Sequence, residues 1–141
     1  MEWVSRYVGL PYVDGGRAFA GVDCWGLCRL VYCHELGVHL PEYGEISARQ
    51  LRDVNEAIEK GREARPWRLV DKPQPYDLCV MTGHVPMDGD RKVIRMRVVH
   101  VGVMVDEKRV LHIEAATDSV VVPIRHPLVS KRIKGFYRHE R

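Results

Sequence analysis

The sequence predicts an α+β fold in which helices come first and an antiparallel sheet follows. Up to about residue 61 the apolar residues recur at helical spacing, whereas from residue 67 onward they form short alternating or continuous runs bounded by turn residues. A cysteine stands where a glycine-containing loop meets the most apolar of the predicted helices. Helices followed by strands are typical of an α+β domain, with the helices packed on one sheet.

Length and composition indicate one domain spanning residues 1–141. The chain is 45% apolar and 29% charged, which is ordinary for a globular protein. Its net charge of +3 and pI of about 8.7 fall short of a nucleic-acid footprint, so we expect no nucleic-acid partner. No segment reaches the length of a membrane span, and the N-terminus lacks a leader, so we expect synthesis in the cytoplasm without a signal peptide.

Three helices are predicted. The first covers residues 3–8, where Gly9 and a following proline stop the helical spacing. The second begins at Cys24 and runs to residue 36, is apolar on nearly every face, and ends at Gly37. The third, over residues 46–58, has a narrow apolar stripe and a charged face.

The second half of the chain reads as strands. The strongest candidate is the valine-rich run at 98–105, and an Asp-Gly hairpin signal within residues 87–97 marks a ribbon that precedes it. The predicted strands cover residues 67–70, 78–81, 98–105, 109–115, 120–124 and 133–138.

Strand register brings two histidines together. Alternate valines of residues 98–105 share one face of the strand, which leaves His100 on the other. If the three-residue connection 106–108 pairs Val105 with Arg109, His112 lies opposite Gly102 and diagonal to His100, roughly 7–8 Å away between backbones. Gly102 then leaves room for both rings. A connection longer or shorter by one residue would put the histidines on opposite faces.

Cys24 is a candidate nucleophile. Asp23 is a favoured N-cap residue, so the helix starts at Cys24 and its positive end favours the thiolate. A helix end contributes at most about 2 kcal/mol, or roughly 1.5 pKa units, which brings a thiol only near neutrality. A protonated imidazole about 4 Å away would add roughly 4 kcal/mol, so the hypothesis requires a histidine.

A cysteine at a helix start with histidines far along the chain is the arrangement expected of a papain-like thiol enzyme. In this interpretation His100 takes the thiol proton, and His112 orients His100 through a hydrogen bond. The Tyr12 hydroxyl could donate a hydrogen bond to a reacting oxygen, although the local sequence alone favours a half-buried packing tyrosine.

A metal site is the alternative interpretation of the cysteines. Cys24, Cys28, Cys33 and His34 are close in sequence, but they lack the paired spacing of zinc ligands. We therefore expect no metal and no cofactor. Cys28, Cys33 and Cys79 are better explained as small buried apolar residues.

Five sequence blocks resemble the NlpC family of papain-like cell-wall peptidases. They occur in the family's order and span most of the chain: Tyr7-Val8-Gly9-Leu10-Pro11-Tyr12, Gly21-Val22-Asp23-Cys24-Trp25-Gly26-Leu27, Pro75-Tyr76-Asp77-Leu78, His100-Val101-Gly102-Val103-Met104-Val105 and Leu111-His112-Ile113-Glu114-Ala115. The resemblance implies a cysteine endopeptidase that cuts peptidoglycan stem peptides, typically between D-glutamate and diaminopimelate or lysine. It implies Cys24 as nucleophile, His100 as base and His112 as the third polar residue. Tyr12 would lie beside the oxyanion site, and Asp23 would support the nucleophile.

Departures from the family pattern bear on the substrate. Trp25 stands where a serine is common, and the ribbon from Met87 to Arg97 is inserted before the histidine strand. We expect Trp25, Gly26 and Gly102 to border the substrate cleft. The small size also resembles short NlpC-type proteins of phage tails, which implies a virion or cell-wall location and phage tail partners. The alternative is a structural tail-assembly protein that keeps the fold with little hydrolytic role.

Overall fold

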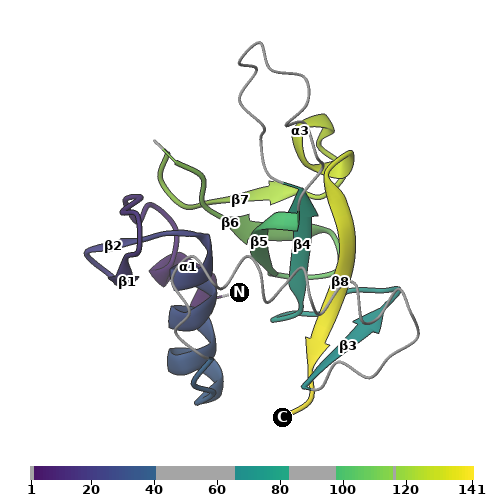
Figure 1. Cartoon of the computed structure of the whole chain (residues 1–141), viewed down its shortest axis with the longest axis horizontal. Coiled ribbons are helices and arrows are strands. Elements are labelled where there is room, and N and C mark those ends of the chain that lie inside the picture. Colours follow the sequence, from purple (N-terminus) through teal and green to yellow (C-terminus); the bar gives the residue numbers. More distant parts are fainter. Residues whose placement is uncertain (1, 41–65, 83–97, 116) are drawn as a thin grey trace.

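The computed structural model describes residues 2–40, 66–82, 98–115 and 117–141, and it confirms the α+β prediction. A helical N-terminal part packs against one antiparallel sheet; the N-terminus lies between α1 and the sheet, and the C-terminus lies at the lower end of β8, beside β3 (Figure 1). The predicted helix at 46–58 and the predicted ribbon at 87–97 lie outside the described residues. Within those residues, no helix has the length and apolar character that a membrane crossing requires.

The N-terminal part contains shorter elements than the sequence predicted. The first helix is a single 3₁₀ segment, η1 (Glu2–Arg6). A small hairpin of β1 (Arg17–Ala18) and β2 (Gly21–Val22), which we did not predict, precedes the cysteine helix. That helix, α1 (Cys24–Val31), continues as a π-helical turn, η2 (Tyr32–Leu36), and stops at Gly37 in the left-handed region, as its glycine predicted.

One six-stranded antiparallel sheet forms the second half of the molecule. Every predicted strand within the described residues is present, with ends that differ by a few residues. The spatial order is β3-β8-β4-β5-β6-β7. The strands are β3 (Trp67–Val70), β4 (Leu78–Thr82), β5 (Val98–Met104), β6 (Arg109–His112), β7 (Val120–Pro123) and β8 (Ile133–His139).

The sheet is buried on both faces. On one face, Val101 and Val103 of β5 pack with Leu27 and Val31 of α1. The other face carries a smaller cluster that includes Val129 of the short helix α3 (Pro127–Ser130). The members of this second cluster are Cys79, Met81, Met104, Val110 and Val129. Burial on both faces explains why β4 is apolar at nearly every position instead of alternating.

The register between β5 and β6 is the one that the sequence predicted. Val105 donates its N–H to the carbonyl of Arg109 at 2.9 Å, and Val103 pairs with Leu111. Continuing the ladder places His112 opposite Gly102. A Cβ at Gly102 would lie 3.0 Å from the Cβ of His112 and closer still to β6 atoms, so a side chain there would push the strands apart. Glycine at this position therefore allows β6 to carry His112 against β5.

Hydrogen bonds to Ser119 tie the chain before Tyr12 to the sheet. Gly9 donates its N–H to the Ser119 carbonyl at 2.8 Å, and Leu10 donates to the Ser119 hydroxyl at 2.8 Å. The same hydroxyl donates to the Tyr7 carbonyl. Ser119 is buried and directly precedes β7. These contacts fix the segment that leads into Tyr12 relative to β6 and β7.

Candidate active site

Asp23 organises the start of the cysteine helix. Its Oδ1 accepts the N–H of Gly26 at 2.7 Å, which is the N-cap bond predicted from sequence. Its Oδ2 accepts the N–H of Gly15 at 3.1 Å, and the Arg17 guanidinium lies 2.7 Å from Oδ1. Asp23 thus joins the glycine loop, the β1–β2 hairpin and α1 around the residue that follows it, Cys24.

The environment of Cys24 favours the thiol, which corrects one expectation from sequence. The helix start was expected to bring the pKa of Cys24 near neutrality, but burial and the neighbouring Asp23 carboxylate raise it to about 11. Backbone N–H groups of Val101 and Trp25 and the Arg17 cation lower the pKa by less than burial raises it. Desolvation outweighs the helix end because the sulfur lies against β5, beside the backbone of the residue after His100.

His100 and His112 form a direct pair, as their predicted register implies. The Nε2 atom of His100 lies 2.9 Å from Nδ1 of His112, with ring planes at 70°. The exposed fractions of the two residues are 6% and 7%, so both rings are sheltered from water. Because Nε2 of His100 faces His112, Nδ1 is the ring nitrogen suited to take the proton of a nucleophile.

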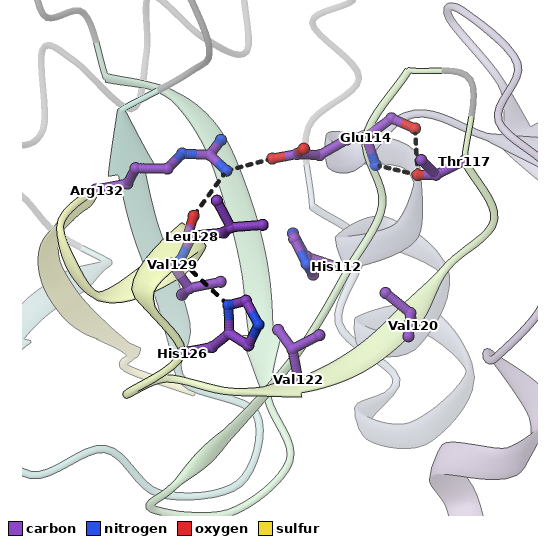
Figure 2. Close-up of a pocket in the computed structure, with 9 residues that line it drawn as sticks. All are labelled: His112, Glu114, Thr117, Val120, Val122, His126, Leu128, Val129 and Arg132. Carbon is purple, nitrogen blue, oxygen red and sulfur yellow. Dashed lines mark hydrogen bonds and ion pairs between the residues drawn. The ribbon is translucent and has the colours of Figure 1, made fainter.

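Glu114 and Arg132 are charged neighbours of this pair that the sequence analysis did not single out as site residues. Glu114 Oε1 lies 3.6 Å from His100 Nε2 and 2.5 Å from Arg132 Nη1. Figure 2 shows the Glu114–Arg132 pair above His112. Glu114 was part of the quoted Leu-His-Ile-Glu-Ala block, two residues after His112, so that block was the available signal. Nothing in the local sequence connects Arg132 to it.

Three side chains of this site, His100, His112 and Glu114, could together hold a metal ion. One ligand atom from each of His100, His112 and Glu114 falls within 4.8 Å of the others, which is compatible with a shared cation. However, the Arg132 guanidinium contacts the same Glu114 oxygen and already supplies a positive charge. A further cation there would be repelled by Arg132, so we assign no metal to these residues.

Tyr12 lies beside the β1–β2 hairpin that precedes Cys24. It is half-buried and bridges to Val22 of β2, and Val13 donates its N–H to the Val22 carbonyl at 3.0 Å. Burial raises the pKa of the Tyr12 phenol, and the negative charges of Asp14 and Asp23 raise it further. The hydroxyl therefore stays protonated at neutral pH and remains a hydrogen-bond donor.

The three residues expected to border the cleft have structural roles here. The Trp25 side chain is 2% exposed and belongs to the core cluster around α1. Gly26 is required because an added Cβ would lie 2.0 Å from the Gly16 carbonyl oxygen. Gly102 makes room for His112, as described above. None of the three lines the cavity described next.

A cavity of about 180 Å³ lies beside His112, between β6, β7 and α3. Four aliphatic residues and five polar or charged residues line it, and Glu114 and Arg132 lie at its upper side in Figure 2. The lining residues are His112, Glu114, Thr117, Val120, Val122, His126, Leu128, Val129 and Arg132. The cavity thus adjoins the histidine pair.

The remaining cysteines differ in their surroundings. Cys28 and Cys79 are fully buried in separate core clusters, as predicted, and burial raises the pKa of the Cys79 thiol to about 12. Cys33 was expected to be buried but is half-buried, with its sulfur 3.7 Å from His39 Nδ1. Among the described residues, the cysteines form no cluster of metal ligands.

Comparisons with known proteins identify the family and the fold of the chain. Residues 9–138 match the sequence model of the NlpC/P60 family. The search of curated proteins found no match. Among solved structures, the NlpC/p60 domain of the peptidoglycan hydrolase SagA has a TM-score of 0.60 and 18% identity, covering 95% of this chain and 91% of that domain.

Two longer solved proteins share the same fold. An NLP/P60-family protein similar to lipoprotein from Staphylococcus aureus has a TM-score of 0.66 and 20% identity over 100% of this chain. An NlpC/P60-family protein from Bacillus cereus has a TM-score of 0.65 and 21% identity over 96% of this chain. The chain spans 40% and 37% of their respective lengths.

Proposed function

Because the chain belongs to the NlpC/P60 family, we propose that it is a cysteine peptidase that hydrolyses amide bonds in peptidoglycan stem peptides. The observation that carries this proposal is the buried 2.9 Å contact between His100 of β5 and His112 of β6. The backbone of β5, at Val101, also contacts the Cys24 sulfur. A similar fold occurs in a domain of a peptidoglycan hydrolase, which supports a cell-wall substrate. We assign the cleaved bond to the D-glutamate to diaminopimelate or lysine type.

The first half of the proposed reaction forms an acyl-enzyme. His100 Nδ1 accepts the Cys24 proton as the sulfur attacks the scissile carbonyl carbon and forms a C–S bond. The resulting oxyanion receives hydrogen bonds from the Cys24 backbone N–H and the Tyr12 hydroxyl. The C–N bond then breaks, and the imidazolium of His100 gives its proton to the leaving amine.

The second half releases the acyl group. A water molecule gives a proton to neutral His100 and attacks the thioester carbon, and the C–S bond breaks as the sulfur regains a proton from His100. The high pKa of Cys24 makes His100 necessary in the first half, because without a base the attacking group is a thiol. In the second half His100 is necessary because it takes the proton of the attacking water. His112 holds the His100 ring in the orientation that both transfers need.

Digestion of purified peptidoglycan tests this function. Wild-type protein is incubated with stem peptides of the diaminopimelate type and the lysine type, and the products are identified by mass spectrometry. We expect one new amine terminus and one new carboxyl terminus per cleavage, with no change in the glycan strand. Intact stem peptides at high protein concentration would contradict the proposal and favour a structural role for the fold.

Replacing His112 by alanine should slow the reaction without abolishing it. The substitution removes the partner of His100 Nε2, so the base is less well oriented, while Cys24 and His100 both remain. We expect kcat to fall by about 10- to 100-fold, the range typical of a misplaced catalytic group. Steady-state kinetics on the cleaved stem peptide measure the effect.

His126→Ala is a suitable control for that variant. His126 lines the same cavity but is exposed, and its Nδ1 accepts the N–H of Leu128 at 3.1 Å instead of contacting His100. Its kcat should stay within about twofold of wild type. Equal losses in the two variants would show that His112 acts through the cavity and not through His100.

A further inference from the structure

We propose that Glu114, held in place by Arg132, is a positioning residue that stabilises the imidazolium form of His100. This inference rests on the proposed function, in which His100 carries the proton during both halves of the reaction. It concerns residues outside the Cys24, His100 and His112 set.

The geometry places a carboxylate on the correct side of His100. Glu114 Oε1 is 3.6 Å from Nε2 of His100, the nitrogen that faces His112. Its charge therefore acts on the side of the ring opposite to the proton-accepting Nδ1. The contact is sheltered, since the His100 side chain is 7% exposed and that of Glu114 is 25% exposed. At this depth a carboxylate stabilises a nearby imidazolium more strongly than it would in water.

Glu114 is held from both sides. Its N–H points to the Thr117 hydroxyl at 3.3 Å, and that hydroxyl donates to the Glu114 carbonyl at 2.8 Å (Figure 2). Its carboxylate meets the Arg132 guanidinium, which is anchored in turn by donating Nε–H to the Thr82 carbonyl at 2.8 Å. The carboxylate is therefore presented to His100 in one geometry.

Arg132 sets the strength of the effect as well as the position. Its positive charge lies beyond Glu114 as seen from His100, so it partly offsets the carboxylate. The groups that face the histidine pair carry charges of both signs. Among the described residues they include His112 and Glu114, from β6 and the turn after it, and Arg132, from the segment between α3 and β8.

This arrangement predicts shifts of opposite sign for the two charged residues. Removing the negative charge in Glu114→Gln makes the imidazolium less stable, so the midpoint at which the His100–His112 pair takes up a proton should fall by about 0.5 to 1 pH unit. Arg132→Gln removes the positive charge but keeps an amide N–H that can donate to Glu114, and the Thr117 contacts also remain. The carboxylate is then unopposed, so the midpoint should rise by a similar amount. Arg132→Lys keeps the charge and should stay near wild type.

Nuclear magnetic resonance titration of the imidazole signals measures these midpoints without any substrate. The His100 signal is assigned by its loss in His100→Gln. Glu107→Gln and Arg125→Gln remove the same charges from exposed residues elsewhere on the surface, so their midpoints should match wild type. The midpoints in the pH dependence of kcat/KM on the stem peptide should shift in the same directions as the imidazole midpoints.

The outcomes separate this inference from the proposed function. Midpoints that do not move in Glu114→Gln, or that move in the same direction in Glu114→Gln and Arg132→Gln, would overturn the role of Glu114 even if the protein cleaves peptidoglycan. Opposite shifts establish the electrostatic role even if no stem peptide is cleaved. In that case the peptidase proposal fails and the inference about His100 stands.

Discussion

Cys24→Ala is expected to lower the rate of stem-peptide cleavage by about 10⁴-fold or more, because no other group at the helix start can form the acyl-enzyme. The change removes one sulfur atom from a half-buried position and leaves the Asp23 N-cap and the Arg17 contact in place. Folding should therefore be preserved. Product formation measured by mass spectrometry gives the rate, and circular dichroism during heating checks the fold.

Cys33→Ala is the matched control for this loss. Cys33 is also half-buried, but it lies in η2 beside His39, away from the start of α1. Its activity should equal that of wild type. Retained cleavage in Cys24→Ala would mean that water attacks the bond directly or that another residue is the nucleophile.

His100→Gln is expected to suppress the reactivity of Cys24 at neutral pH. A thiol with a pKa of about 11 is ionised in only about one molecule in 10⁴ at pH 7, so the sulfur needs the imidazole to react. An imidazolium partner at an effective dielectric of about 20 favours the thiolate by roughly 4 kcal/mol, or about 10³-fold. We expect alkylation of Cys24 by iodoacetamide to be about 10²- to 10³-fold slower in the variant.

The other cysteines could also be alkylated in this experiment, and their burial determines how fast they react. Cys28 and Cys79 are buried thiols whose pKa values are raised, and they should react slowly in the folded protein. Cys33 is half-buried, so both proteins should carry Cys33→Ser. Peptide mapping then assigns the label to Cys24. Equal alkylation rates with and without His100 would remove His100 from the mechanism.

The part of the site that could be predicted from sequence depends on strand periodicity and turn length. The alternation in β5 and the three-residue connection to β6 determine which side chains face each other. The pairing of His100 with His112 follows from that register. The N-cap role of Asp23 could also be predicted from local sequence, because its side chain accepts the N–H of Gly26, only three positions away.

The rest depended on contacts between distant segments. Arg132 meets Glu114 only because α3, a four-residue helix with no measurable periodicity, turns the chain back toward β6. The burial of Trp25 at the start of α1 also results from packing that the local sequence does not show. The pKa of Cys24 was expected too low because desolvation of its sulfur by β5 cannot be read from the helix alone.

The small hairpin of β1 and β2 was missed for a related reason. Each strand has only two residues, which is too short for an alternating pattern. Its position follows from the Arg17 ion pair with Asp23 and from the close approach of Gly16 to Gly26. The hairpin and the nucleophile are therefore coupled through contacts that local sequence does not show.

Intact-protein mass spectrometry of an acid-quenched reaction tests the central claim most directly. Protein mixed with excess stem peptide for short times should gain the mass of the carboxylic acid product less one water, and fragmentation should place that mass on Cys24. The adduct should be absent in Cys24→Ala and should accumulate when deacylation is slow. Product release with no adduct at any time, or an adduct on another residue, would contradict the account.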